Sequence, residues 1–259
     1  MSAPITTELI KELRDATGIS VMQCKRALEE AAGDMKKALA ILKKTSSDIA
    51  LKKADRETKD GAVTIKEGKG KSVLVSLHCE TDFVSKNNDF TSLLTQLVDK
   101  AFAEGVEKMR VTAKDMINPV IQKTGENIEL GDAYEVAGEV LGSYIHNGKI
   151  GVIVSLLGGN QELAKDIAMH TAAMKPEYIS STDISEDTRK TMTEIFQKEV
   201  ASVDKPEEIK KKMLLGKLTT YFKEKTLLEQ PFVKNPEETV GKLLEKAKAK
   251  IKEVKRYSI

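Results

Sequence analysis

The chain has 259 residues, of which 40% are hydrophobic and 32% are charged, with 6 prolines and 16 glycines. At roughly 100 to 200 residues per domain, this length allows one large domain or two to three smaller ones, and the composition excludes disordered, collagen-like and low-complexity proteins. The 42 basic and 40 acidic residues leave a net charge of +2, so nucleic-acid or membrane binding would need a local patch rather than a global field.

Residues 1–45 predict three short helices. Gly18 ends the first helix, and Ser20 with Gln23 predicts a capping box that opens the second. Apolar residues recur at helical spacing in each segment. The three predicted apolar stripes are Ile5, Leu9 and Leu13; Val21, Cys24, Ala27, Leu28 and Ala31; and Met35, Leu39 and Leu42. Three helices in about 45 residues are near the lower size for independent folding, so we expect a small binding module attached to a larger body.

Residues 46–61 have few large apolar side chains and many charges, which suits a solvated helical linker or a flexible one. We assign the following residues, 62–140, to a first core subdomain. Within it, residues 62–66 and 71–78 predict a β-hairpin, and a helix with Asn87, Asn88 or Asp89 as its cap follows.

A short sequence repeat links the two halves of the core. The run VLVSL at Val73–Leu77 returns as VIVSL at Val152–Leu156, and each copy continues through a loop into a helix, the second from about Gln161 to Met174. We therefore expect two related α/β halves. The first copy carries HCETDFVSKNN where the second needs only GGN, and an insertion that a fold does not need often carries function.

The second core subdomain is predicted in two parts, residues 141–184 and 227–259, separated by an antiparallel helical hairpin at 185–226. Apolar residues at helical spacing define both hairpin helices, and Pro206 lies near the start of the second. Such a hairpin exposes an apolar seam unless a partner covers it. A helix at about 238–248 and a strand at about 251–257 close the chain. The predicted fold class is α+β, with antiparallel sheets in the core.

Few residues suggest catalysis. Neither a GxxxxGK[ST] nor a GxGxxG loop is present, so direct nucleotide binding is not expected. His78 and Cys79 are metal-ligand and nucleophile types, but neighbours on a strand point to opposite faces, which disfavours a shared site. His170 lies on an apolar helix face and is predicted to be a core residue. His146 lies in a predicted loop, where a contact role and a plain turn role are equally open.

The two cysteines, Cys24 and Cys79, form no CxxC pattern, so no disulfide framework or zinc site is indicated and a reducing compartment fits best. The most apolar stretch, 150–159, is about half as long as a membrane-spanning helix. The first residues lack the apolar core of a signal peptide. We therefore expect a cytoplasmic protein that does not bind membranes.

Thr81-Asp82-Phe83 places a large aromatic side chain beside a carboxylate in a polar loop. Such a ring either folds into the core or is presented to the pocket of a partner. The residues alone leave both outcomes open.

Five separated segments, in order over nearly the whole chain, resemble the translation elongation factor Ts family. They are TELIKELRDATGISVMQCKRALEEAAGDMKKAL, CETDFVSKN, GEVLGSYIHNGKIGVIVSL, DIAMHTAAMKPEYI and LLEQPFVKNPEETVGKLL. The resemblance implies that the first module is UBA-like and that the helical hairpin is a dimerisation element. It also implies a guanine-nucleotide exchange factor for the GTPase elongation factor Tu, without an active site, catalytic residue, metal or cofactor of its own.

The site residues follow from the same resemblance. The family's TDFV segment, which dislocates Mg²⁺ from the GTPase, matches Thr81, Asp82, Phe83 and Val84. By this match Phe83 wedges between helices of the GTPase domain and Asp82 helps to perturb the magnesium site. Further GTPase contacts match Lys11, Val21, Met22 and His146. The family has methionine where this chain has Val21, which implies a smaller contact there.

Three points stay open. The resemblance leaves a one-to-one complex with the GTPase and a two-to-two complex, formed by a homodimer through the hairpin, both possible. Two other functional classes rest on residues alone. One is an RNA-binding protein that uses the basic segment Lys246–Arg256, although no aromatic residue interleaves it before Tyr257. The other is a thiol or metal enzyme at Cys79.

Overall fold

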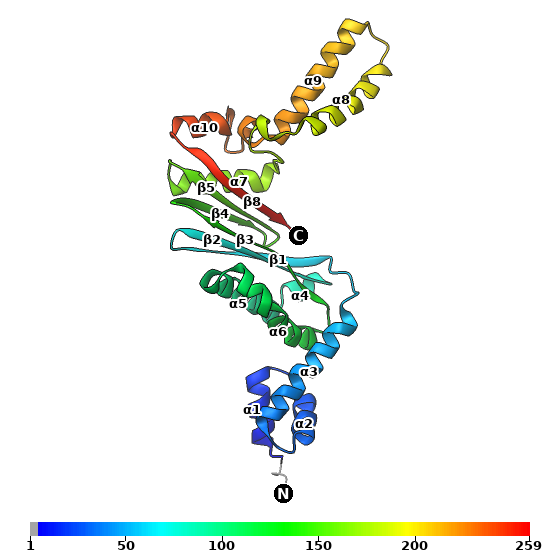
Figure 1. Cartoon of the computed structure of the whole chain (residues 1–259), viewed down its shortest axis with the longest axis vertical. Helices are drawn as coiled ribbons and strands as arrows, with labels where there is room; N and C mark the ends of the chain where they lie inside the picture. Colours follow the sequence, from blue (N-terminus) through cyan, green and yellow to red (C-terminus); the bar gives the residue numbers. More distant parts are fainter. Residues whose placement is uncertain (1–4) are drawn as a thin grey trace.

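The computed structural model describes residues 5–259. An N-terminal module is formed by helices α1 (Thr7–Thr17), α2 (Val21–Glu30) and α3 (Met35–Lys53) (Figure 1). Each helix starts at a residue whose side-chain oxygen accepts a hydrogen bond from the first turn, namely Thr6, Ser20 and Asp34. The predicted capping box is half formed, because the Gln23 side chain accepts the Ser20 hydroxyl at 3.0 Å instead of bonding the backbone.

The module's core differs from the predicted stripes at two positions. Val21 is 49% exposed and Leu39 is 40% exposed, so neither belongs to the core that the other stripe residues share with Ala38. Helix α3 also continues through part of the predicted linker, to Lys53, because Ala50 packs into the core of the next subdomain. Residues 46–53 are therefore helical and join the module firmly to the body.

The first core sheet has the antiparallel order β1-β2-β3. Its strands are β1 (Asp60–Gly68), β2 (Lys71–Cys79) and β3 (Ile128–Ala137). The short helix α4 (Asp82–Ser85) follows β2, and the long helices α5 (Asn88–Glu104) and α6 (Val106–Thr124) cover one face of the sheet (Figure 1). No element is predicted from sequence at α6 or β3.

The second core sheet has the antiparallel order β4-β5-β8. Its strands are β4 (Val140–His146), β5 (Ile150–Leu157) and β8 (Lys250–Ser258). Helices α7 (Gln161–Met174) and α10 (Val240–Lys246) pack into the core on its outer face. A small ladder, β6 (Pro231–Phe232) with β7 (Asn235–Thr239), and two 3₁₀ turns, Ser181–Asp183 and Leu227–Glu229, complete this half. The last helix is shorter than predicted and the last strand slightly longer.

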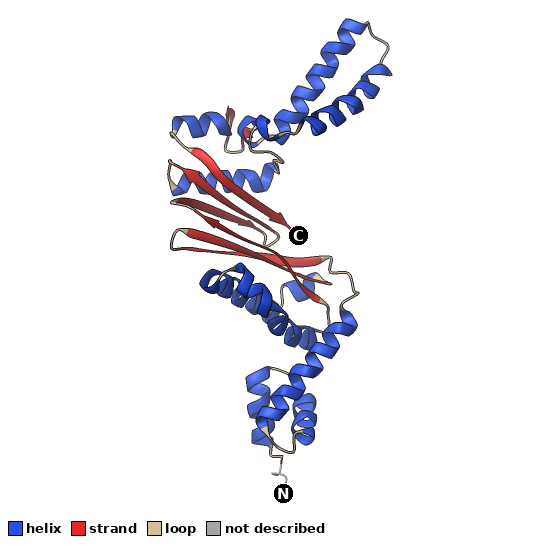
Figure 2. Cartoon of the chain, in the orientation of Figure 1, coloured by secondary structure: helices blue, strands red, loops and turns tan. Residues whose placement is uncertain are grey.

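The two sheets pack face to face, with helices on both outer sides (Figure 2). Leu74 of β2 and Ile153 of β5, which hold matching positions in the VLVSL and VIVSL repeat, are both fully buried between the sheets. Each repeat therefore forms the central strand of one sheet. The α+β fold class, with antiparallel sheets, is confirmed.

Helices α8 (Glu186–Ala201) and α9 (Glu207–Lys225) form an antiparallel hairpin that projects away from the sheets (Figure 1). The Phe196 and Tyr221 rings pack edge to face between them, with centroids 5.6 Å apart. Ile195, Ile209 and Leu215 stay 44%, 45% and 67% exposed. Across residues 5–259, the helices are all too short or too polar to cross a membrane.

Candidate functional site

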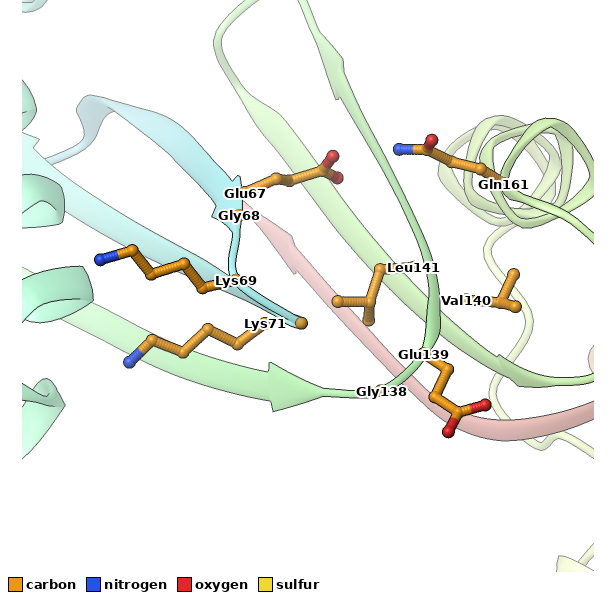
Figure 3. A pocket seen from close by; sticks show the side chains of 10 residues that line it. Glu67, Gly68, Lys69, Lys71, Gly138, Glu139, Val140, Leu141 and Gln161 are labelled. Carbon is orange, nitrogen blue, oxygen red and sulfur yellow. The ribbon is translucent and has the colours of Figure 1, made fainter.

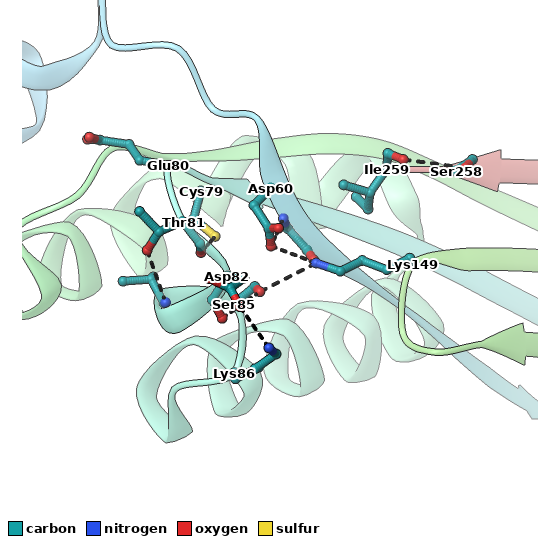
Figure 4. Close-up of polar contacts among 12 residues, drawn as sticks. Asp60, Cys79, Glu80, Thr81, Asp82, Ser85, Lys86, Lys149, Ser258 and Ile259 are labelled. Atoms are coloured by element: carbon teal, nitrogen blue, oxygen red, sulfur yellow. Dashed lines mark hydrogen bonds and ion pairs between the residues drawn. The ribbon is translucent and has the colours of Figure 1, made fainter.

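The TDFV segment lies where the chain leaves the first sheet and enters its helical cover (Figure 4). It is predicted as a loop, but Asp82–Ser85 form the short helix α4. Thr81 is extended, with φ −132° and ψ 159°, and its side chain caps the turn by accepting from the N–H of Val84 at 3.5 Å. A threonine cap thus turns the chain sharply after β2.

Phe83 and Val84 lie on different sides of this turn. Val84 is 8% exposed and packs in the core beneath the sheet with Cys79 and Phe90. Phe83 is 83% exposed. The choice that the sequence leaves open is therefore settled for the free protein, in which the Phe83 ring is presented to solvent. A single exposed aromatic ring on an anchored turn is the kind of side chain that fills a partner's pocket.

Asp82 lies on the same turn and is also exposed. Its Oδ2 accepts from Lys86 Nζ at 2.8 Å, one helical turn later. The Asp82 carboxylate raises the pKa of Lys86. Because both side chains are about half exposed or more, the ion pair contributes little to stability, and little free energy is lost when it breaks. Asp82 is therefore free to face a new partner.

Lys149 ties the second sheet to α4, a contact that sequence patterns do not predict (Figure 4). Its ammonium donates to Asp60 Oδ1 at 2.6 Å and to the carbonyl of Gly61 at 2.5 Å, and it approaches Ser85 Oγ at 3.5 Å. Burial alone would raise the pKa of Asp60, but the Lys149 ammonium and nearby hydrogen-bond donors outweigh burial and lower it. The carbonyl of Lys149 accepts from the N–H of Ile259 at 3.0 Å.

His146 is the last residue of β4. The predicted loop that contained it is mostly strand, and only a tight turn joins β4 to β5. Its side chain is exposed, and its Nδ1 lies 3.0 Å from the Tyr144 hydroxyl. The Lys149 contacts hold this turn beside β1 and α4. The structure thus brings the His146 turn and the TDFV segment to neighbouring positions.

Lys11, Val21 and Met22 lie elsewhere, on α1 and α2 of the N-terminal module, beyond α5 and α6 (Figure 1). All three are exposed, Met22 at 59%. They lie on the N-terminal module, whose Ser20 and Gln23 share an open crevice with Asp89 of α5 and Lys123 of α6.

Cys79 is unsuited to nucleophilic catalysis. Its thiol is buried and donates to the carbonyl of Thr81 at 3.2 Å. Burial, with a smaller effect from nearby carboxylates, raises the pKa of Cys79 to about 12, so the reactive thiolate is scarce at neutral pH. His78 points to the opposite face and pairs with the Tyr257 hydroxyl at 2.6 Å. Among residues 5–259, His, Cys, Asp and Glu side chains do not gather in threes as a metal site requires.

The basic segment near the chain end does not form one surface. Lys246 pairs with Glu238 at 2.5 Å, and Lys252 donates to a β3 carbonyl at 2.9 Å. Burial lowers the pKa of Arg256. Tyr257, the aromatic residue that directly follows the segment, is partly buried against the cluster between the sheets. This geometry disfavours a stacking platform for RNA.

His170 is a fully buried core histidine, as predicted. Its Nδ1 accepts from the N–H of Val233 at 3.2 Å, which leaves Nε2 to donate to Gln230 Oε1 at 2.9 Å. The imidazole is therefore neutral and both nitrogens are satisfied.

The open crevice shown in Figure 3 is not a convergent ligand site. It has a volume of about 400 Å³ and lies between the β1–β2 turn, the β3–β4 turn and the start of α7. Its polar side chains diverge, because Lys69 and Lys71 extend to one side while Glu139 and Gln161 lie on the other (Figure 3). Ligand sites instead aim a few polar groups at one point.

Comparison with known proteins agrees with this geometry. The family model described as Elongation factor TS matches residues 80–259. The elongation factor Ts of Hahella chejuensis is 40% identical over 264 residues, which cover 99% of this chain and 92% of that protein. The elongation factor Ts of Pseudomonas syringae pv. tomato is 40% identical over 254 residues, covering 96% and 88%. That of Pseudomonas aeruginosa is 38% identical over 265 residues, covering 99% and 91%.

Proposed function

The chain belongs to the elongation factor Ts family, and from that premise we propose that it is the guanine-nucleotide exchange factor of elongation factor Tu, acting in cytoplasmic translation. It binds the GDP-bound GTPase, perturbs the Mg²⁺ and phosphate-binding region, releases GDP and leaves the site open to GTP. It needs no active site of its own.

The observation that carries this proposal is the exposure of Phe83. A phenylalanine that is 83% exposed contributes little to its own fold, and its display on a capped turn is best explained by a partner. Insertion of this ring between helices of the GTPase domain would separate elements that hold the nucleotide. Asp82, on the same turn, would then face the region of the magnesium ion.

The physical logic is linkage. Phosphates of a bound nucleotide are held largely through Mg²⁺ and the phosphate-binding loop, so a displacement of either speeds release. The exchange factor has only to bind the nucleotide-free GTPase more tightly than the nucleotide-bound form. Binding of the factor and binding of the nucleotide then weaken each other by the same factor.

Two further surfaces support the complex in this proposal. His146 lies near α4 and would act on the phosphate-binding loop from the neighbouring turn. Lys11, Val21 and Met22 would hold the GTPase domain from the N-terminal module. Because these residues lie on separate parts of the chain, the factor would grip its partner at two places and use Phe83 as the wedge.

The hairpin of α8 and α9 is the proposed dimerisation element, since it projects from the body and keeps apolar side chains exposed. A homodimer through it would give a two-to-two complex, and a monomer would give a one-to-one complex. Light scattering of the free factor and of the complex distinguishes the two.

The direct test is release of a fluorescent GDP analogue from elongation factor Tu, chased with excess unlabelled GDP. A sub-stoichiometric amount of this protein should accelerate release over many turnovers. No acceleration, with both proteins folded, would contradict the proposed function.

A further inference from the structure

The turn that presents Phe83 is held by one carboxylate from a distant part of the chain. Glu126 lies in the connection between α6 and β3. Its Oε2 accepts the N–H groups of Glu80 and Thr81 at 3.1 and 3.0 Å, and its Oε1 accepts the Thr81 hydroxyl at 2.6 Å. Three donors from two consecutive residues therefore converge on a single side chain.

The N–H groups of Glu80 and Thr81 do not bond to a neighbouring strand or within a helix. Strand β2 ends at Cys79 and α4 begins at Asp82, so residues 80 and 81 form the bend between two regular elements. Backbone N–H groups at such a bend need acceptors. Hydrogen bonds to an ionised carboxylate are shorter and roughly twice as strong as neutral ones. Glu126 thus sets the direction in which the chain enters α4.

The contact is reciprocal. Glu80 Oε1 accepts the N–H of Asn127 at 2.6 Å, and the Asn127 side-chain amide donates to the carbonyl of Arg56 at 3.0 Å. The two segments, 80–81 and 126–127, therefore exchange hydrogen bonds in both directions. This arrangement fixes their relative orientation more firmly than one bond would, because each bond restricts the geometry of the others.

The other end of α4 is held differently. Val84 anchors the turn in the core, and Ser85 lies 3.5 Å from Lys149 Nζ. Loss of Glu126 would leave these anchors in place and free only the segment that precedes Asp82. We expect such a change to alter the orientation of the turn without unfolding the subdomain.

We propose that Glu126 is the positioning residue of the Phe83 turn: its carboxylate holds the bend at Glu80 and Thr81, so that the ring is aimed before the partner arrives. This inference rests on the proposed exchange function. A group ordered in advance loses less conformational freedom on binding, so Glu126 contributes to exchange through Phe83 rather than by touching the GTPase.

Three variants test the proposal. Glu126→Ala removes all three acceptor contacts. Glu126→Gln is the rescue variant, because its amide oxygen can accept the two N–H groups while its NH₂ donates to the Thr81 hydroxyl. Glu135→Ala is the matched control, since Glu135 lies on the same sheet and accepts a charged hydrogen bond, from Lys71 at 3.0 Å, but none from residues 80–84 or 126–127.

The first readout needs no GTPase. Amide hydrogen exchange of Glu80 and Thr81 should be about tenfold faster or more in Glu126→Ala, return toward wild type in Glu126→Gln and be unchanged in Glu135→Ala. Unchanged protection in Glu126→Ala would overturn the clamp itself, whatever the protein's function.

The second readout is a double-mutant cycle with Phe83→Leu, a truncation that keeps some apolar bulk. The maximal rate of GDP release at saturating factor should fall about tenfold in Glu126→Ala and recover in Glu126→Gln. In the Phe83→Leu background the same change should cost less than about twofold, because an effect that acts through Phe83 is not additive with its loss. Equal losses in both backgrounds would overturn the positioning role. If wild type itself fails to accelerate release, the proposed function fails, while the hydrogen-exchange result still decides the clamp.

Discussion

Phe83 and Val84 are consecutive residues of one short helix, yet the first is 83% exposed and the second is 8% exposed. The threonine cap at residue 81 creates this division, because it starts a helical turn whose successive side chains point about 100° apart. One side of the turn is anchored in the core and the other is exposed to solvent. We therefore expect mutations of Val84 to affect stability and mutations of Phe83 to affect function.

Val84→Ala should act on stability. The removal of two buried methyl groups from the core beneath the first sheet is expected to lower the free energy of unfolding by about 1 to 2 kcal/mol. Urea denaturation monitored by circular dichroism measures this change. A loss below about 0.3 kcal/mol would mean that the turn is not anchored by Val84.

Gly151→Ala should weaken the packing of the two sheets. A Cβ at Gly151 would lie 2.6 Å from Leu74 Cδ1 and 3.3 Å from Val63 Cγ2. Overpacking of this kind costs about 1 to 3 kcal/mol, and urea denaturation would show it. Gly216→Ala is the control, since a Cβ there would meet no described atom within 4 Å. Inside a helix, alanine is more stable than glycine by about 0.5 to 1 kcal/mol, so this substitution should not destabilise the protein. Equal effects of the two substitutions would contradict the close approach of the sheets.

His170 should make the protein less stable in mild acid. Burial lowers its pKa, so the unfolded chain binds more protons than the folded one between the folded-state pKa and the ordinary value of about 6.5. The free energy of unfolding therefore rises with pH across that window. The contribution of the neutral His170 is fully present above about pH 6.5 and is lost as the pH falls through the window. His78, whose pKa burial also lowers, contributes with the same sign.

Urea denaturation at a series of pH values between about 5 and 8 measures this slope. His170→Gln should be less stable than wild type at neutral pH but should show a shallower slope. A slope of opposite sign, or one that the substitution leaves unchanged, would contradict a neutral imidazole with both nitrogens hydrogen-bonded.

Cys79 should resist thiol reagents in the folded protein. Its thiol is buried, and burial raises its pKa to about 12, so both access and thiolate formation oppose reaction. We expect an aromatic disulfide reagent at pH 8 to label Cys79 only after urea is added, with mass spectrometry of peptides to identify the site. Rapid labelling of Cys79 in native protein would reopen the thiol-enzyme hypothesis.

Local signals predicted a large part of the fold. The caps at Ser20 and Asn160 and the VLVSL repeat depend on neighbours in sequence, and each lies where the pattern indicates. Helix α6 and strand β3 are not among the predicted elements, although the buried Met109, Ala113, Ile117 and Ile121 of α6 recur at helical spacing. Pro119 lies inside α6, where a proline normally disfavours a helix, and Gly131 lies inside β3 at a place where the Ser76 and His78 side chains press against the strand. Those glycine contacts exist only once the sheet has formed.

The candidate site shows the same limit. The sequence shows that the TDFV segment places an aromatic ring beside a carboxylate. The exposure of Phe83, however, depends on how Val84 packs. The hydrogen bonds of Glu126 to Thr81 and of Lys149 to Asp60 join residues far apart in the chain. A lone glutamate or lysine carries no local pattern that reveals such a partner, so these two residues emerge only from the structure.

The most direct test of the account compares Phe83→Ala with Val111→Ala, a truncation of another highly exposed apolar residue, 84% exposed, on α6. GDP release from elongation factor Tu and urea denaturation are measured on both variants. We predict that Phe83→Ala slows factor-dependent release by more than about tenfold, as expected for an interface anchor, while its free energy of unfolding stays within about 0.5 kcal/mol of wild type. Val111→Ala should match wild type in both. Normal exchange by a folded Phe83→Ala variant would contradict the wedge.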